Sequence, residues 1–352
     1  LTAVGKAGGA ARSQETTLLA IRSQVLGGGL VTPRASSTAN ASVTGTLPLW
    51  EVPVVLLIRH RRIVWRLALP AATLIACARE TVPARASFTD DFGDTLAMST
   101  PPARIVSLNP ATTEILYAVG AGPRVVGRTT YDAYPPRVRA VTDLGPGLRP
   151  NVEAIIATHP DLVLLYASED NRDAARRLRA AGIRTAAFRV DRIRDLDRVT
   201  RLVGHLTGDS AEASRTIDSV SVTLARVRAA TATLPHPSVF WPFWESPLLS
   251  VGGGSFVNEM IELAGGRNVF AELPQPSPQI TFEELVRRDP DLILTGPSTR
   301  QRILSDPRWQ TLRAVRTGHI LVIDTSIVNG PSPRVGANTV GLAKLLHPEA
   351  KL

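Results

Sequence analysis

The stretches NVEAIIATHPDLVLL at residues 151–165 and TFEELVRRDPDLILT at residues 281–295 decide the fold, because both follow one plan. Each starts with a residue that commonly caps a helix, places an acid in the first turn, and spaces its apolar residues as a helix does. Each helix then stops at Pro-Asp, and a short apolar run typical of a buried strand follows. We interpret the two stretches as one helix–strand unit that occurs once in each half of the chain.

A second, looser match extends this repeat: TEILYAVGAG at residues 113–122 lies over NEMIELAGGR at residues 258–267. Asn109 and Pro110 suit the cap and the first position of the earlier helix, which we expect to end at Val119. Expected strands and helices alternate over most of the chain, which indicates an α/β architecture. The alternative, that unrelated helix–strand units simply look alike, stays open.

The segment between the two halves has no strong helix breaker, and its apolar residues recur at helical spacing. One helix of about 25 residues would be about 37 Å long. We therefore expect two similar α/β lobes joined by a single long helix, with a ligand cleft between the lobes and little opening of that cleft. The expected bounds are 103–207 for the N-terminal lobe, 208–234 for the linking helix and 235–352 for the C-terminal lobe.

The sequence before the first lobe resembles an export signal followed by a tether. Basic residues precede the apolar run LALPAATLIA at residues 67–76, which has the length of a signal-peptide core and is too short to span a bilayer. The run ends at Cys77 in a motif similar to that of bacterial lipoproteins, so we expect Cys77 to carry a lipid; the alternative is a buried free cysteine. The expected segments are a disordered stretch or a start site assigned too far upstream at 1–58, a lipoprotein signal peptide at 59–77 and a flexible tether at 78–102.

Charge and cysteine content exclude two classes of function. The formal net charge is +9, but residues 1–77 hold eight Lys or Arg and two Asp or Glu, and the remainder holds 32 against 29. There is no basic stripe interleaved with aromatic residues, so we expect no nucleic-acid partner. The single cysteine excludes an internal disulfide and a zinc site built from several thiolates.

No catalytic motif is present in the sequence. A nucleophile elbow, a zinc-binding His-Glu-x-x-His motif and a Walker loop are all missing, and the glycines at 252–254 lack the Lys-Ser/Thr that would hold a nucleotide. The histidines are well separated along the chain. We therefore expect no enzyme activity, no catalytic residues, no metal site and no resident cofactor.

Aromatic residues make up only 5% of the chain, so their clustering is informative. Several of them follow expected strands, and ligand sites in α/β proteins lie beyond the carboxyl ends of strands. Planar rings there offer rigid apolar contact to a small molecule. The alternative is that some of them pack in the core. The candidate ligand-binding aromatic residues are Tyr131, Tyr134, Tyr166, Trp241, Phe243 and Trp244.

Several motifs together resemble the periplasmic solute-binding proteins of metal-chelate importers, and within that family the vitamin B12-binding members. The resemblance runs from about residue 104 to about residue 346. It rests on RIVSLNPATTEILYAVG, YDAYPP, NVEAIIATHPDLVLL, SVGGGSFVNEMIELAGGRNVF, PSPQITFEELVRRDPDLIL and the late SPR. Each motif alone is weak, but their order along the chain is specific.

The resemblance implies a monomeric, extracytoplasmic protein, anchored to the membrane by its lipid, that captures a cobalamin-like chelate and delivers it to the permease of an ABC transporter. It places Tyr131, Tyr166 and Phe243 in the cleft, and it makes Glu153 and Glu262 the two residues that dock on permease arginines. The internal repeat alone would have paired Glu153 with Glu283 instead.

The chain departs from the vitamin B12-binding pattern at two places. Ser277 stands where those proteins have a tryptophan, and the loop at 144–150 has no counterpart of a second cleft tryptophan. We count Ser277 and Asn329 with the candidate ligand contacts. A ferric siderophore or haem therefore stays open as the cargo, as do an enzyme built on a related two-lobed fold and a structural lipoprotein that has lost its ligand.

Overall fold

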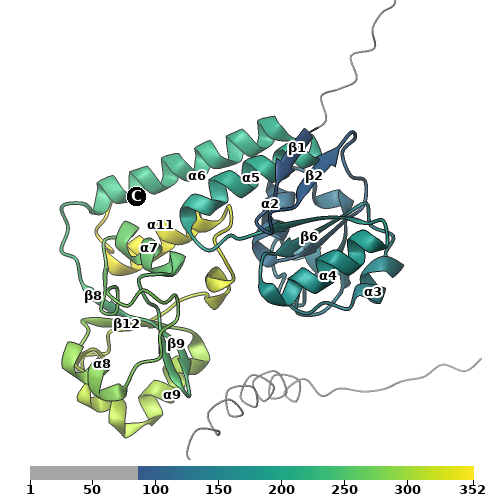
Figure 1. Ribbon diagram of the computed structural model, residues 1–352. Helices are drawn as coiled ribbons and strands as arrows, with labels where there is room; N and C mark the ends of the chain where they lie inside the picture. Colours follow the sequence, from purple (N-terminus) through teal and green to yellow (C-terminus); the bar gives the residue numbers. More distant parts are fainter. Residues whose placement is uncertain (1–85) are drawn as a thin grey trace, which may run out of the picture. The chain divides into compact units, whose positions relative to one another are not determined.

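The computed structural model describes residues 86–352 (Figure 1). The N-terminal lobe is built on a five-stranded parallel sheet in the order β5-β4-β3-β6-β7. Its strands are β3 Ile105–Leu108, β4 Val125–Arg128, β5 Thr142–Asp143, β6 Leu162–Tyr166 and β7 Arg184–Phe188.

Helices cover both faces of this sheet, as the alternation of side chains requires. Leu162 and Leu164 pack in the same core as the helices α2 Pro110–Ala118 and α5 Ile193–Thr207. Val163 and Leu165 point the other way, toward α3 Val152–Ala157 and α4 Glu169–Ala180. A strand buried on both faces reads as a continuous apolar run, which is why LVLLY at 162–166 is apolar nearly throughout.

The C-terminal lobe repeats this plan with a four-stranded parallel sheet in the order β11-β8-β12-β13. Val239 and Leu294 face the core that α7 shares, whereas Phe240 and Ile293 face the core around Leu285. The elements of this lobe are β8 Ser238–Phe240, α7 Phe256–Leu263, β11 Arg267–Asn268, α8 Phe282–Arg288, β12 Leu292–Thr295, α9 Pro297–Ser305, α10 Arg313–Arg316, β13 Ile320–Val322 and α11 Val335–Leu346.

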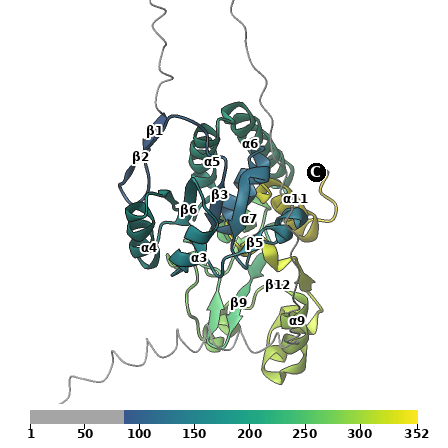
Figure 2. The same cartoon turned by 90° about the vertical axis from the view of Figure 1, so that its right-hand side faces the viewer.

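A single helix, α6 Ser210–Thr231, connects the two lobes, and at 22 residues it is about 33 Å long. It packs against α5 in the first lobe and against α11 and α7 in the second, and it lies beside α5 in both views (Figures 1 and 2). The helix is shorter than the expected span 208–234, because Gly208 ends α5 with a φ of 79°. The expectation of two α/β lobes and one continuous linking helix is confirmed.

Helix caps follow the sequence prediction closely. The Asn109 side chain accepts a hydrogen bond from the backbone N–H of Ala111, and the Asn151 side chain accepts one from Ala154, each at 3.0 Å. Thr281 and Glu284 form the expected reciprocal capping box. These local rules could be applied without knowing the rest of the structure.

Residues 86–98 differ from the flexible tether expected at 78–102. They form a hairpin of β1 Ala86–Thr89 and β2 Thr95–Met98 on the N-terminal lobe. The turn is fixed by Asp90, whose carboxylate accepts hydrogen bonds from Phe92 and Asp94 and from the backbone N–H of Ala187 on β7. The tether prediction is therefore corrected for this part, because a buried aspartate attaches the hairpin to the sheet edge.

The apolar run at 239–244 is divided between two strands. β8 ends at Phe240, and β9 Pro242–Glu245 pairs with β10 Leu248–Ser250 in a separate hairpin. Proline has no N–H to donate to a sheet ladder, so Pro242 ends the central strand. The side chain of Trp241 lies at this corner and is 2% exposed.

The remaining connections are short 3-10 helices: η1 Gly122–Arg124, η2 Pro136–Ala140, η3 Pro307–Thr311 and η4 Thr325–Val328. Within residues 86–352, no helix has the length and apolar content needed to cross a membrane. The segments expected at 1–58 and 59–77, with Cys77, lie outside the described residues.

Candidate ligand cleft between the lobes

A cavity of about 440 Å³ lies between the two lobes and is lined by residues of both. The N-terminal lobe contributes Leu108, Asn109, Pro110, Pro146, Gly147, Leu148, Tyr166, Val190 and Asp191. The C-terminal lobe and the segment before α11 contribute Phe243, Gly254, Ser255, Phe256, Val257, Pro276, Ser277, Val328, Asn329 and Gly330.

The helices α2 and α7 bring equivalent ends to this cavity. Asn109 and Ser255 are the residues that cap these two helices, and both line the cavity. The first N–H groups of a helix have no partner within that helix, and its dipole is positive at this end. At both helices the cap side chain accepts a hydrogen bond from one of these first N–H groups, that of Ala111 on α2 and that of Val257 on α7, so the positive ends of the two dipoles face the cavity with capped donors.

Tyr166, at the end of β6, places a phenol in the cavity wall. Its hydroxyl donates a hydrogen bond to Oδ1 of Asp191 at 2.8 Å. Burial, together with this hydrogen bond to Asp191 and its negative charge, raises the pKa of Tyr166 to about 12. The Asp191 side chain is 43% exposed, and the nearest atom of Arg189 is 3.9 Å away. The wall thus carries a protonated phenol held by a carboxylate.

The three aromatic residues around Pro242 have three different environments. Phe243 is 45% exposed and lines the cavity. Trp244 is 47% exposed, does not line it, and donates its indole N–H to the backbone carbonyl of Ser246 at 2.9 Å. Trp241 lies in the core, not in the cavity wall. Neighbouring side chains of a strand point to opposite faces, so the rings of Phe243 and Trp244 on β9 face opposite ways.

Ser277 and Asn329 line the cavity. The two tyrosines of the YDAYPP turn, Tyr131 and Tyr134, do not. Tyr134 is 44% exposed, and the guanidinium of Arg334 lies 4.5 Å from the centre of its ring. Tyr131, three residues earlier in the chain, is partly buried. Of the eight candidate ligand contacts, the structure brings together four: Tyr166, Phe243, Ser277 and Asn329.

Two ion pairs join the lobes close to the cavity. Arg334, before α11, makes a two-point contact with Glu114 on α2, with N···O distances of 2.8 and 2.7 Å. This pairing raises the pKa of Arg334 above its usual value. In the second pair the arginine belongs to the N-terminal lobe: Arg192, before α5, contacts Glu259 on α7 at 2.6 Å.

The glutamates of these two pairs are equivalent in the internal repeat, because Glu114 follows Thr113 as Glu259 follows Asn258. Glu259 also accepts a hydrogen bond from the backbone N–H of Ile193 at 2.8 Å. The repeat motif Thr/Asn-Glu at the start of both helices was the signal that could have identified these contacts. Glu114, Glu259 and their arginine partners were not among the predicted functional residues.

The two expected docking glutamates are exposed and lie on different lobes. Glu153 on α3 has a side chain that is 73% exposed and pairs with Arg177 at 2.6 Å. Glu262 on α7 is exposed and accepts a hydrogen bond from the side-chain amide of Asn258 at 2.8 Å.

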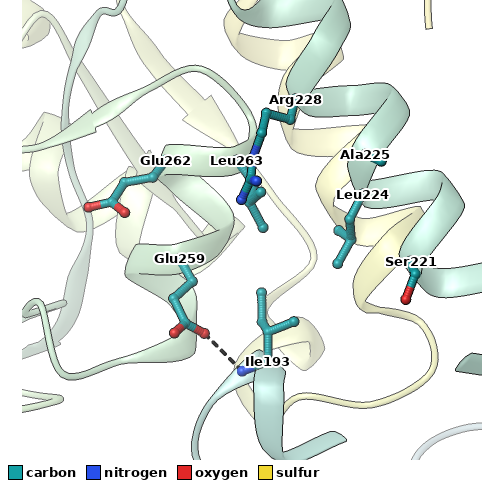
Figure 3. Close-up of a pocket in the computed structure, with 8 residues that line it drawn as sticks. All are labelled: Ile193, Ser221, Leu224, Ala225, Arg228, Glu259, Glu262 and Leu263. Atoms are coloured by element: carbon teal, nitrogen blue, oxygen red, sulfur yellow. Dashed lines mark hydrogen bonds between the residues drawn. The ribbon is translucent and has the colours of Figure 1, made fainter. Parts of the chain in front are cut away.

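A second pocket, of about 490 Å³, lies beside Glu262. Figure 3 shows Glu259 and Glu262 of α7 on one side of it and Arg228 and Leu224 of α6 on the other. The dashed line marks the hydrogen bond from Ile193 to Glu259, so the contact that joins the lobes forms one wall of this pocket.

The described residues hold no group of three or more His, Cys, Asp or Glu side chains placed to bind a metal ion. The cavity wall itself has one carboxylate and one phenol, and none of its residues is a His, Cys, Lys or Arg. Its surfaces are suited to enclosing a small molecule through apolar contact and a few hydrogen bonds.

Comparison with known proteins gives a consistent result. The model of a family described as periplasmic binding protein matches residues 105–326. A cobalamin-binding protein of Halobacterium salinarum is 29% identical over 266 residues, covering 72% of this chain and 71% of that protein. An uncharacterized ABC transporter substrate-binding lipoprotein of Bacillus subtilis is 29% identical over 256 residues, covering 70% of this chain and 81% of that protein.

Solved structures share the two-lobed fold. The periplasmic haem-binding protein RhuT of Roseiflexus sp. RS-1, in its apo form, is similar with a TM-score of 0.64 and 25% identity. That comparison covers 72% of this chain and all of RhuT, 100%.

Proposed function

Because the chain belongs to the periplasmic binding protein family, we propose that it captures cobalamin or a similar corrinoid outside the cytoplasm and delivers it to the permease of an ABC importer. Proteins of this family are the substrate-binding components of such transporters. The observation that carries the proposal is the cavity between the lobes, whose wall both lobes supply. A ligand held in this cavity would contact both lobes, and the single helix α6 between the lobes would allow little opening of the cleft.

The character of the cavity wall supports a bulky, largely apolar chelate. Tyr166 and Phe243 present rings from opposite lobes, and Pro146, Leu148 and Val190 add apolar surface. Such walls, with a few polar groups, are typical of small-molecule sites. Ser277 and the loop at 144–150 have no tryptophan where the vitamin B12-binding proteins have one, so the contact with a corrin ring would rest on Tyr166 and Phe243. The cobalamin-binding relative supports the same ligand.

Haem or a ferric siderophore is the alternative cargo. The haem-binding relative of known structure favours haem, and a tyrosine is a known ligand of haem iron. Tyr166 is the only tyrosine in the cavity wall. Its hydroxyl is engaged with Asp191, however, and a phenol with a pKa of about 12 is a poor source of the phenolate that binds iron.

The proposal assigns no chemical reaction to the chain, because the family is one of binding proteins. We further propose that Cys77 carries a lipid, that Glu153 and Glu262 dock on the permease, and that the protein acts as a monomer with no cofactor of its own. The exposure of both glutamates on different lobes supports the docking assignment.

Calorimetric titration of the whole chain tests the ligand. We expect saturable binding of cyanocobalamin at micromolar concentration or below, with quenching of tryptophan fluorescence. Haemin and a ferric hydroxamate siderophore are titrated under the same conditions. Absence of heat and quenching with micromolar cyanocobalamin would remove cobalamin as the ligand, and binding of haemin or the siderophore in its place would establish the alternative.

A further inference from the structure

The cavity wall has one carboxylate, and its charge bears on which ligands can enter. Among the residues that line the cavity, Asp191 is the only one that is charged at neutral pH, since Tyr166 stays protonated and the rest are neutral. The other carboxylate oxygen, Oδ2, accepts no hydrogen bond from Tyr166 and lies 3.9 Å from Nε of Arg189. A ligand that enters the cavity therefore meets a single negative charge.

The arginines around the cavity do not offset this charge. Each of three has an acidic partner: Arg149 contacts Asp170 at 2.9 Å, Arg192 contacts Glu259 at 2.6 Å, and Arg334 contacts Glu114 at 2.7 Å. Each guanidinium is therefore already neutralised by a carboxylate.

Arg189 is the arginine that pairs with Asp191, and its Nε lies 3.9 Å from Oδ2 of that carboxylate. Its side chain is 61% exposed, and one of its nitrogens donates to the backbone carbonyl of Ala167 at 3.1 Å. Its charge is thus directed to solvent and to the backbone, and water screens it.

We propose that Asp191 determines the charge class of the ligand, so that the cleft accepts electroneutral chelates fringed with amide groups and rejects anionic ones. This inference rests on the proposed function, since it concerns the ligand of the same cleft. Tyr166 acts as a positioning residue, because its hydroxyl holds Oδ1 of Asp191 at 2.8 Å, so that a ligand would meet Oδ2, whose contact with Arg189 is long at 3.9 Å.

The physical reason is the sign of the interaction with each class. An amide N–H of a corrinoid side chain donates a hydrogen bond to a carboxylate, and hydrogen bonds to charged groups are stronger than neutral ones. The carboxylates of haem and the oxygens of a ferric catecholate carry negative charge, which Asp191 repels. The Asp191 side chain is 43% exposed, so water screens part of this repulsion, but the mostly apolar cavity wall screens it less than bulk water would.

The test compares three probes on the whole chain: cyanocobalamin, a neutral ferric trihydroxamate and an anionic ferric tris-catecholate. Asp191→Asn keeps the shape and the acceptor for Tyr166 and removes the charge. We expect this variant to bind the anionic catecholate on the order of tenfold more tightly than the unchanged chain does. Its affinity for cyanocobalamin is expected to change much less.

Asp173→Asn is the matched control, because it removes the same charge from an exposed position on α4, where Asp173 pairs with Arg176. It should leave all three affinities unchanged. Added salt should reduce the discrimination against the catecholate in the unchanged chain, and should have little effect in Asp191→Asn.

The outcomes separate this inference from the proposed function. If the unchanged chain binds cyanocobalamin but Asp191→Asn leaves its preference among the probes unaltered, or if Asp173→Asn shifts that preference equally, Asp191 does not determine charge class. If the unchanged chain binds none of the probes, the proposed function and this inference both fail.

Discussion

The helices α2 and α7 occupy equivalent places in the two lobes, and the ion pairs that they form across the cleft differ in burial. The side chains of Glu114 and Arg334 are 9% and 20% exposed. Those of Glu259 and Arg192 are 22% and 27% exposed. The internal repeat thus extends beyond secondary structure to the contacts that join the lobes, and the pair made by α2 is the better shielded of the two.

The two walls of the cavity differ far more than the contacts between the lobes. The N-terminal wall has the carboxylate of Asp191 and the phenol of Tyr166, whereas the C-terminal wall has Phe243, Ser277 and Asn329, which are all neutral. The two lobes are thus alike in the contacts that join them and unlike in the side chains that line the cavity.

The largest effect is expected from Glu114→Gln. This change leaves the partly buried guanidinium of Arg334 without its counter-charge, and breaking a buried pair in this way is strongly destabilising. We expect the free energy of unfolding in urea to fall by about 2 kcal/mol, less than for a fully buried pair because Arg334 keeps some contact with water.

Glu212→Gln is the control for this prediction. Glu212 pairs with Arg215 on α6, but both side chains are well exposed, at 42% and 68%. Exposed pairs contribute little, so a loss below about 0.5 kcal/mol is expected. Equal losses of unfolding free energy for the two variants would show that the pair of Glu114 and Arg334 stabilises the fold no more than an exposed pair does.

Phe243→Ala should have the next largest effect, on ligand binding. Removing this ring from the cavity wall should weaken binding of cyanocobalamin about tenfold, which corresponds to about 1.4 kcal/mol. Trp244→Ala is a closely matched control, because the neighbouring ring is equally exposed and does not line the cavity. Titration calorimetry measures both, and a larger loss for Trp244→Ala would mean that the ligand lies on the other face of β9.

Glu259→Gln should destabilise the chain by a smaller amount, about 1 kcal/mol, because both partners of this pair have more contact with water. The Gln side chain still offers an acceptor to the backbone N–H of Ile193. Urea unfolding of both glutamine variants under one set of conditions ranks the two pairs. If Glu259→Gln lowers the free energy of unfolding as much as Glu114→Gln does, burial does not determine how much each ion pair contributes to stability.

The smallest effect concerns docking, where the repeat and the family resemblance disagree. The repeat pairs Glu153 with Glu283 on α8, whereas the resemblance pairs it with Glu262 on α7. Glu262→Gln should slow cyanocobalamin uptake by cells a few-fold through weaker steering to the permease, and Glu283→Gln should leave uptake unchanged. Binding of ligand to the purified chain should be the same for both. Slower uptake with Glu283→Gln alone would favour the repeat.

Much of the fold could be predicted because its signals are local. A cap such as Asn109 or Thr281 and a strand such as LVLLY follow from neighbouring residues, and the repeat then gives two lobes. The hairpin at 86–98 could not be predicted in this way. Its strands have four residues each, and what holds them is the contact of Asp90 with Ala187, far along the chain.

The cleft was harder to predict than the fold. Tyr166 and Phe243 could be selected because rings after strands are rare in this chain, and the structure places both in the cavity wall. Trp241 was selected by the same rule, but Pro242 breaks the strand and turns that ring into the core. Asp191 lies in the short connection between β7 and α5, where no local pattern marks a functional residue, and its place in the cavity wall emerges only from the tertiary fold.

A crystal structure of the whole chain with cyanocobalamin tests the central claim most directly, which is that the two lobes bind one chelate between them. We predict a corrinoid in contact with Tyr166 of the N-terminal lobe and with Phe243 of the C-terminal lobe. A ligand that touches only one lobe, or one that occupies the pocket beside Glu262 with the cleft free of ligand, would contradict the account.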